Sequence, residues 1–231
     1  MGSFSDFIIK LKQMRAKWWD RNINIRKFRT TDFCLLSNNC WASMHFYQRF
    51  GLEYNIPVVG LYISDHDFIK FCNNLEYYLS LPIVFVSPET SPAYNEICRW
   101  GSKSGKEEKI EFPVGMIGDI TLWFMHYKSE QEAREKWYRR RSRLNPDKVI
   151  IKWSQRYTDD DLIVEDFLKL PYPKFGFVDD VCQIESPELI KLAGWTELKD
   201  TGGDEIGFSG RNIDTIKIIN DAFDRQNNKS R

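Results

Sequence analysis

From Thr30 onward, the sequence alternates short apolar runs with longer segments in which apolar residues recur at helical spacing. The predicted strands are residues 32–36, 57–63, 83–86, 120–127, 149–153 and 175–178. The predicted helices are residues 40–50, 65–78, 129–144, 162–170, 187–193 and 213–225. Strands that alternate with helices form mainly parallel sheets, because a helix carries the chain back to the start of the next strand. We therefore expect an α/β fold, a Rossmann-like three-layer sandwich with a mainly parallel sheet.

The length of 231 residues suits one globular domain, and 42% apolar residues are enough to build its core. We expect a basic amphipathic helix over residues 1–30 and a single α/β domain over residues 31–231. No apolar run approaches the roughly 18 residues of a membrane span. The N-terminus also lacks the pattern of a signal peptide. These features favour a cytoplasmic protein.

The charges and the cysteines argue against several classes of protein. Basic and acidic residues each number 33, so the balance gives no strong case for nucleic-acid binding. The five cysteines are odd in number and include no C-x-x-C pair, which argues against a disulfide framework or a structural zinc site. We therefore expect reduced thiols and no metal. The sequence does not indicate an oligomeric state.

The charge is unevenly distributed, because residues 1–30 contain 8 basic and 2 acidic residues. In this segment Phe7, Ile8, Leu11 and Trp18 recur at near-helical spacing, with lysines and arginines between them. Such a helix has two interpretations. It packs its apolar face against its own domain with the cations in solvent, or it lies peripherally on an anionic membrane surface, at the inner face of the membrane.

Open α/β sheets bind ligands at the carboxyl ends of their strands, and several of these ends are polar in this sequence. The candidate substrate-binding residues at these ends are Ser37, Asn38, Asn39, Asp65 and Arg156. The pattern indicates where a site lies and says little about its reaction. The chain contains no Walker A or G-x-G-x-x-G motif that would indicate a nucleotide-phosphate loop.

Cys40 is the candidate nucleophile, because it falls at a strand-to-helix turn where free backbone N–H groups and the helix dipole favour a thiolate. A catalytic cysteine needs a nearby base, and His126, at the end of a predicted strand, is the candidate. His45 lies five residues after Cys40 on the same predicted helix and would point elsewhere unless the turn is distorted. The alternative is that Cys40 is a small buried residue under this helix.

Asp119 follows the glycine-containing segment 113–118, which predicts a tight turn that leads into a strand. Its carboxylate either orients a catalytic histidine or caps that turn. The arginine-rich run 139–143 lies on a predicted helix, where it either binds the phosphates of a ligand or forms a solvated helix end. Arg156, which follows a predicted strand, is the stronger candidate for an anion contact.

Five runs between residues 30 and 157 carry a resemblance to a known family. They are residues 37–41 (SNNCW), 51–61 (GLEYNIPVVGL), 67–71 (DFIKF), 113–119 (PVGMIGD) and 126–137 (HYKSEQEAREKW). Their order and spacing resemble an uncharacterised bacterial family, domain of unknown function nineteen-nineteen. Its members are often labelled exopolysaccharide-biosynthesis proteins and sometimes acetyltransferases. The resemblance implies an α/β fold and a role in surface-polysaccharide assembly, and it brings no established catalytic residues.

The strand-Asn-Cys-helix arrangement around Cys40 is also similar to a capsule-biosynthesis family in which a Cys and a His are the proposed pair for acyl transfer. That similarity implies a coenzyme A thioester as cosubstrate. We therefore expect a transferase that moves an acyl group to a sugar or a lipid-linked glycan. Cys40 would be its nucleophile, His126 its base and Asp119 the residue that orients His126. The alternative is a non-catalytic module of the polysaccharide assembly machinery that binds a nucleotide-sugar or a glycan phosphate.

Overall fold

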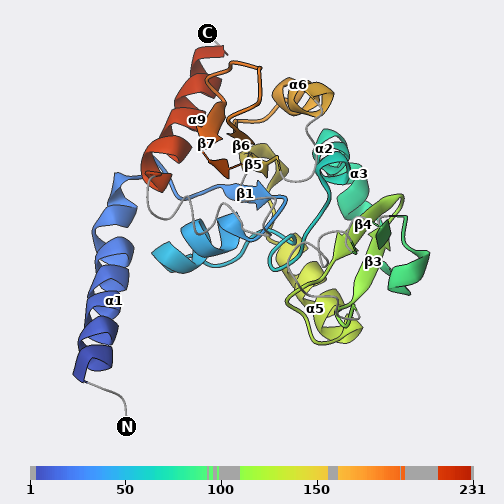
Figure 1. The fold of residues 1–231 in the computed structure, drawn as a ribbon, viewed down its shortest axis with the longest axis horizontal. Helices are drawn as coiled ribbons and strands as arrows, with labels where there is room; N and C mark the ends of the chain where they lie inside the picture. Colours follow the sequence, from blue (N-terminus) through green and yellow to red (C-terminus); the bar gives the residue numbers. More distant parts are fainter. Residues whose placement is uncertain are drawn as a thin grey trace.

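The computed structural model describes residues 4–92, 94–95, 98, 110–155, 161–192, 194–195 and 213–229 (Figure 1). Its helices include α1 (Phe4–Asn22), α2 (Asp65–Asn73), α3 (Leu75–Ser80), α5 (Glu130–Arg141), α6 (Asp161–Lys169) and α9 (Thr215–Lys229). Its strands are β1 (Cys34–Ser37), β2 (Val84–Val86), β3 (Val114–Ile117), β4 (Ile120–Trp123), β5 (Val149–Ser154), β6 (Lys174–Asp179) and β7 (Leu189–Leu192). Short helical segments are η1 (Asn24–Lys27), η2 (Ser43–Gln48), η3 (Pro88–Thr90) and η4 (Pro146–Lys148). Arg156 lies outside the described residues.

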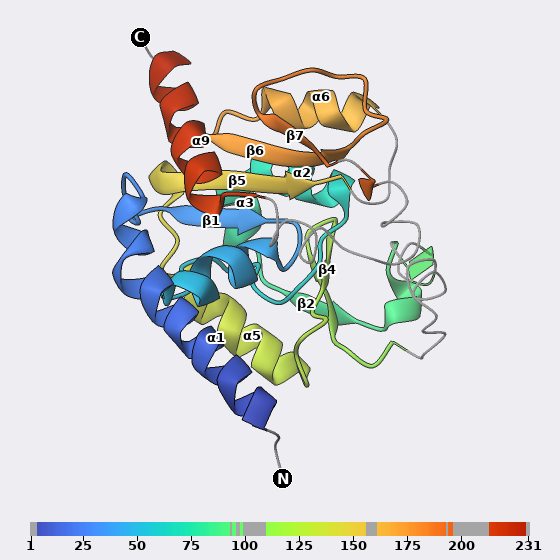
Figure 2. The same cartoon turned by 60° about the vertical axis from the view of Figure 1, so that its left-hand side comes forward.

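The larger of two sheets is parallel throughout, with the strand order β1-β5-β6-β7 (Figure 2). Strands β1, β5 and β6 are buried along their whole length, as expected of parallel strands that are covered on both faces. Successive side chains alternate between the faces, so Trp153 packs against Phe167 of α6 while Lys152 lies over the ring of Trp41. The predicted strands 32–36, 149–153 and 175–178 therefore correspond to β1, β5 and β6.

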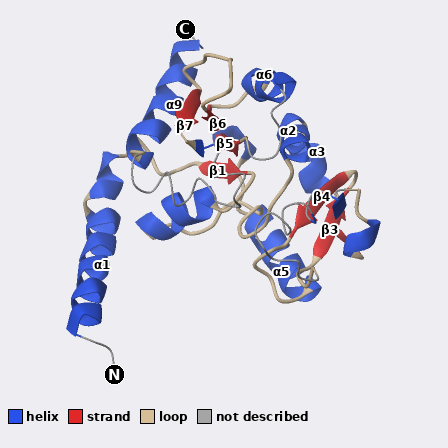
Figure 3. Cartoon of the chain, in the orientation of Figure 1, coloured by secondary structure: helices blue, strands red, loops and turns tan. Residues whose placement is uncertain are grey.

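The smaller sheet is antiparallel, with the order β2-β3-β4, and Figure 3 shows it as a separate group of strands. Strands β3 and β4 form a hairpin, and Gly118 in its turn has a φ of +60°, which glycine adopts without strain. The prediction that residues 83–86 and 120–127 belong to the parallel sheet is wrong, because they contain β2 and β4. A two-residue turn joins only antiparallel strands, which fixes the direction of this pair.

Residues 57–63 do not form the predicted strand. The run is fully apolar or glycine after Pro57, but Gly60 has a φ of +72° and turns the chain. Within this run, Tyr62 alone makes a bridge, an isolated antiparallel one to Trp123. Most of the segment is nevertheless buried, so the apolar pattern correctly indicates burial and wrongly indicates extended pairing.

Residues 187–193, whose pattern predicts a helix, contain strand β7 instead. The backbone of β7 pairs in parallel with β6, for example Phe177 with Ile190. Glutamate, leucine and lysine favour a helix locally, but the preference is a few tenths of a kcal/mol per residue. The open edge of β6 offers a row of backbone hydrogen bonds, which outweighs that preference.

Two of the predicted helices begin with a serine that caps the first turn. The Ser64 hydroxyl accepts a hydrogen bond from the Asp67 N–H at 3.2 Å, and the Ser129 hydroxyl accepts one from the Glu132 N–H at 3.2 Å. The helix predicted to run through Tyr78 is divided at its middle into α2 and α3. The helix predicted after β1 is present and contains the π-helical segment η2.

Helix α1 stands apart from the rest of the chain (Figure 1). Every residue over 7–19 is exposed, and the polar ties to the body come from the last turn, where Asp20 pairs with Arg49 at 2.9 Å. The interpretation in which this helix packs its apolar face against its own domain is therefore wrong, since Leu11 and Trp18 remain in solvent. Among the described residues, no helix has both the length and the apolar character that crossing a membrane requires.

One hydrophobic core connects the two sheets. It extends from Leu36 and Ile151 of the parallel sheet to Ile117 and Leu122 of the hairpin. Helix α2 lies between the sheets, with contacts to β5, to β4 and to α6. The fold is thus a mixed α/β arrangement with a four-stranded parallel sheet and a small antiparallel sheet.

Candidate functional site

The carboxyl ends of β1 and β5 meet at one edge of the parallel sheet, and both end in polar residues. Ser37 closes β1 and is followed by Asn38 and Asn39, while Ser154 closes β5. All four side chains are buried. A buried polar group needs hydrogen-bond partners, so this edge requires a network of contacts.

Asn38 joins the two strands to helix α2. Its Nδ2 donates to the Asp65 carboxylate at 3.0 Å and to the Ser154 carbonyl at 2.9 Å, and its Oδ1 accepts from the Ser154 N–H at 3.0 Å. The Trp153 Nε1–H donates to the same Asp65 oxygen at 3.0 Å. The structure therefore brings together two predicted site residues, Asn38 and Asp65, in a rigid buried arrangement.

Lys152 is a fully buried cation on the face of β5 opposite to that of Trp153. Its Nζ donates to the Asn39 Oδ1 at 3.0 Å and to the Ser154 hydroxyl, and it lies 5.6 Å from the Trp41 ring centroid and 5.2 Å from that of Phe177. Cation–π contacts of this kind help to stabilise a desolvated ammonium group. A lysine in the middle of the apolar run VIIKWS was the sequence signal for this residue.

Cys40 follows directly on this edge and is partly exposed. It precedes the helix that begins at Trp41, and its carbonyl accepts from the Met44 N–H at 3.1 Å and from the Ser43 hydroxyl at 2.7 Å. The π-helical segment η2 distorts this helix, and such segments are frequent at functional sites. The His45 ring lies 5.4 Å from that of Trp41, between ring centroids.

His126 and Tyr127 lie just past β4, next to the turn at Gly60. The His126 N–H donates to the Gly60 carbonyl at 3.1 Å, and the His126 side chain is exposed. Burial raises the pKa of the Tyr127 hydroxyl, and the charge and the hydrogen bond of the neighbouring Arg140 lower it in part.

Arg140 is a buried arginine on α5 that holds this corner together. Its Nη1 donates to the Tyr127 hydroxyl at 2.6 Å and to the Val59 carbonyl at 3.3 Å, and its guanidinium lies 5.0 Å from the Tyr54 ring centroid. Among the described residues, no carboxylate pairs with it. The sequence does not single out Arg140, because nothing in the local pattern separates it from the other arginines of the run 139–143. One of these, Arg143, pairs with Glu53.

Asp119 lies in the hairpin turn, at the opposite end of β4 from His126. Its carboxylate pairs with Lys70 of α2 and accepts a hydrogen bond from the Tyr78 hydroxyl at 2.9 Å. Both contacts lower the pKa of Asp119. The structure thus does not bring Asp119 and His126 together, and the contacts of Asp119 fasten the hairpin to α2 and α3.

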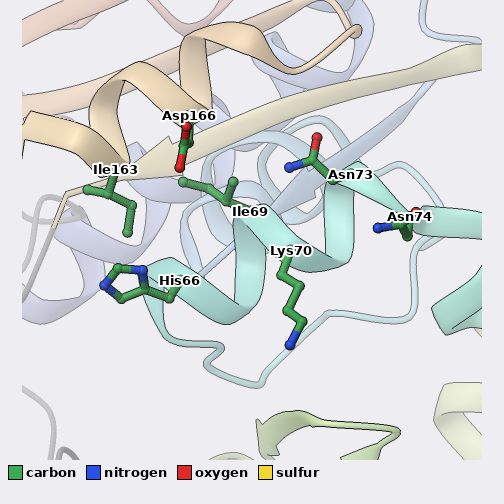
Figure 4. A pocket seen from close by; sticks show the side chains of 7 residues that line it. All are labelled: His66, Ile69, Lys70, Asn73, Asn74, Ile163 and Asp166. Atoms are coloured by element: carbon green, nitrogen blue, oxygen red, sulfur yellow. The ribbon is translucent and has the colours of Figure 1, made fainter.

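A groove of about 220 Å³ lies between α2 and α6 (Figure 4). Its lining residues are His66, Ile69, Lys70, Asn73, Asn74, Ile163 and Asp166. The Lys70 side chain points away from α6, and its ammonium group pairs with Asp119. None of the predicted site residues lines this groove, so it is separate from the edge where Cys40 lies.

Burial distinguishes Cys40 from three other cysteines. Cys34, Cys72 and Cys182 are buried, and burial raises the pKa of each thiol. Such thiols are protonated and unreactive at neutral pH. Cys40 and Cys98 are only partly buried, and Cys40 follows the polar end of β1 in the chain. No group of three or more potential metal ligands is present within the part of the chain that the structure describes.

Comparison with known proteins identifies the family. Residues 11–192 match the family described as "Domain of unknown function (DUF1919)", so the chain belongs to this family. It is also similar to an uncharacterised protein of Haemophilus influenzae, with 29% identity over 189 residues that cover 75% of this chain and 82% of the relative. The match includes Cys40, His126 and the polar edge, and it ends with β7.

Proposed function

We propose that this protein is an acyltransferase of bacterial exopolysaccharide or capsule assembly, with Cys40 as its nucleophile and His126 as its base. The observation that carries the proposal is the position of Cys40. It is a partly exposed thiol at the carboxyl edge of a parallel sheet and at the start of a helix. Parallel α/β sheets bind their ligands at this edge, and the Rossmann-like arrangement predicted from the sequence has the same consequence.

The proposed reaction has two steps. In the first, the Cys40 thiolate attacks the carbonyl carbon of a coenzyme A thioester, a C–S bond forms to Cys40, and coenzyme A leaves as a thiolate that takes up a proton. In the second, His126 accepts the proton of a sugar hydroxyl while the hydroxyl oxygen attacks the acyl carbon. The C–S bond to Cys40 then breaks, the thiolate is restored and the acyl group remains on the sugar as an ester.

Two local features support a thiolate at Cys40. The helix that begins at Trp41 directs the positive end of its dipole toward the preceding residue, and its first N–H, that of Trp41, donates to the Asn39 Oδ1 at 3.1 Å. The Arg140 guanidinium, which donates to the Tyr127 hydroxyl, adds a cation beside the residue that follows the proposed base His126. Helix N-termini and neighbouring arginines are the environments in which cysteines become nucleophilic.

The second candidate is a module that binds a nucleotide-sugar or a glycan phosphate without turning it over. Arg140 favours this candidate, because it is a buried cation with a carbonyl, a hydroxyl and an aromatic ring as its contacts and no described carboxylate. A phosphate group is a natural partner for a guanidinium in such a position. Both candidates assign the protein to the cytoplasmic side of the assembly process, where activated sugars and coenzyme A thioesters are the substrates.

Mass spectrometry of the intact protein after incubation with acetyl-coenzyme A tests the proposal. We expect one acetyl group on Cys40, none in the Cys40→Ala variant, and full labelling in a Cys98→Ser control. The His126→Gln variant should form the acetylated species and fail to pass the group to a sugar acceptor, so that the label accumulates. Absence of any label, together with binding of a uridine diphosphate sugar that Arg140→Met abolishes, would contradict acyl transfer and support the binding module.

A further inference from the structure

Helix α1 presents an apolar stripe that no part of the described chain covers. Its members, spaced four, three and four residues apart, are Phe7, Leu11, Met14 and Trp18, with exposed fractions of 59%, 48%, 67% and 56%. This spacing puts all four side chains on one face of the helix. Exposed apolar residues that occur singly are normal, but a continuous stripe marks a surface that binds something.

Basic residues flank the stripe on both sides. At 100° per residue, Lys10 and Lys17 fall along one side of the stripe and Arg15 along the other. No acidic residue occurs from Phe7 to Trp19. The helix therefore combines an apolar face with a purely cationic border, which complements a surface that is both apolar and anionic.

The helix has little support from the body of the protein. The Arg49 guanidinium donates to Asp20 at 2.9 Å, and the Arg21 guanidinium donates to the Gln48 carbonyl at 3.1 Å, so the hydrogen bonds to the body begin in the last turn. Figure 1 shows the N-terminal end of α1 far from both sheets. Helices in proteins gain most of their stability from tertiary packing of an amphipathic face, and residues 7–19 of α1 are exposed. We expect α1 to gain its stability from a surface on which it docks.

A second copy of the chain does not fit this surface well. The spacing of Phe7, Leu11, Met14 and Trp18 is also that of a coiled-coil seam, in which the flanking positions of two helices face each other. These flanking positions include Lys10, Arg15 and Lys17, so cations would face cations whether the two helices ran parallel or antiparallel. The same cations are favourable next to anionic lipid.

We propose that α1 is a docking helix for an anionic phospholipid surface, on which it lies with the stripe buried among the acyl chains and its cations at the headgroups. Trp18 and the neighbouring Trp19 suit the boundary between the two regions, because indole rings have an apolar body and a polar N–H. The proposal rests on α1 alone, so it stands or fails independently of the reaction proposed for Cys40.

Sedimentation of the full chain with vesicles tests this proposal. We expect binding to vesicles of phosphatidylcholine with phosphatidylglycerol, much weaker binding to phosphatidylcholine alone, and loss of binding in high salt. Each cation removed near an anionic surface should lower the partition constant about fivefold. Lys10→Gln combined with Lys17→Gln should therefore weaken binding about 25-fold.

Two sets of variants separate α1 from other exposed side chains. Leu11→Ser combined with Trp18→Ser should abolish sedimentation, whereas Leu162→Ser, which alters an exposed leucine on α6, should not change it. The exposed Lys169 and Lys217 serve as the control pair for the two lysines of α1. Neither set should lower the melting temperature, because the altered side chains are exposed.

Three outcomes would overturn the proposal. The first is sedimentation that is equal for the variants of α1 and for wild type. The second is a wild-type dimer in light scattering that dissociates in the Leu11→Ser and Trp18→Ser variant, with no vesicle binding, which would assign the stripe to a second copy. The third is a lower melting temperature of that variant, which would show that the stripe packs on the domain.

Discussion

Helix α2 carries two aspartates in its first turn, and they face different parts of the molecule. Asp65 points to the parallel sheet, where it accepts hydrogen bonds from the side chains of Asn38 and Trp153. Asp67 points to the antiparallel sheet, where it accepts one from the Thr121 N–H at 2.9 Å. The same helix end thus anchors both sheets, with side-chain donors on one side and a backbone donor on the other.

The contacts of Asp65 and those around Asp67 differ in burial, and burial determines how much each contributes to the free energy of unfolding. Asn38 and Trp153 are almost completely inaccessible, so the removal of one partner leaves another polar group without solvent. Around Asp67, the Thr121 N–H is buried and depends on the carboxylate, but the nearby pair of Lys70 and Asp119 is exposed, so water replaces a lost partner of that pair at little cost. The comparison indicates that the buried hydrogen-bond network beside Cys40 is rigid. The exposed ion pair at the hairpin tolerates the loss of a partner.

The largest effect is expected from Asn38→Ala. The substitution removes three hydrogen bonds and leaves the Asp65 carboxylate and both backbone groups of Ser154 short of a partner in a buried site. The free energy of unfolding should fall by about 3 kcal/mol. Urea denaturation measures it, with the exposed Asn73→Ala as control, which should change it by less than about 0.5 kcal/mol. An equal effect of the two variants would contradict the importance of burial.

A smaller effect, with a characteristic pH dependence, is expected from Asp67→Asn. Burial raises the pKa of Asp67, and the Thr121 N–H and Lys70 offset it only in part. The folded state therefore holds the proton to higher pH than the unfolded state, and Asp67 costs stability as pH rises from about 4 through its raised pKa. Asparagine keeps the acceptor for Thr121 without the charge. Urea denaturation across this pH range should show that the free energy of unfolding of the variant increases relative to that of wild type as pH rises. The opposite trend would contradict the raised pKa of Asp67.

The smallest effect is expected from Asp119→Asn. The Lys70 ammonium and the Tyr78 hydroxyl lower the pKa of Asp119, so its favourable contribution is complete above the ordinary carboxyl pKa and is lost as pH falls through the lowered value. Both partners in the ion pair are exposed, and salt screens them. The free energy of unfolding, measured by urea denaturation, should differ only slightly between variant and wild type at neutral pH. The difference should vanish in high salt. A loss as large as that of Asn38→Ala would contradict the comparison.

The sequence predicts the parallel sheet well and the rest of the fold less well. Strands β1, β5 and β6 are short apolar runs with loops after them, and this pattern suffices to identify them. Residues 57–63 show one limit of a local pattern, because a buried irregular segment and a buried strand have the same apolar composition. Residues 189–192 show another, because the pairing with β6 is a long-range contact that local propensity does not contain.

The sequence indicates the edge of the sheet at which the candidate site lies. It does not indicate the hydrogen-bond network of that site. The polar residues after β1 indicate the edge, and Asn38 lies there as expected. The roles of Lys152 and Arg140 depend on contacts with residues far away in the sequence, such as Asn39 and Tyr127, which no local pattern specifies. Arg156, the predicted anion contact, lies outside the described residues.

The rate of Cys40 alkylation by iodoacetamide as a function of pH tests the central claim most directly, because the proposed reaction requires a reactive thiolate at this edge. The modified cysteine is identified by mass spectrometry of peptides from the folded protein. We expect Cys40 to react before Cys34, Cys72 and Cys182, at a rate that reaches its plateau below the pH at which free cysteine does, and that falls in Arg140→Met. A Cys40 that reacts only after the protein unfolds, or that titrates like free cysteine, would contradict the proposed nucleophile.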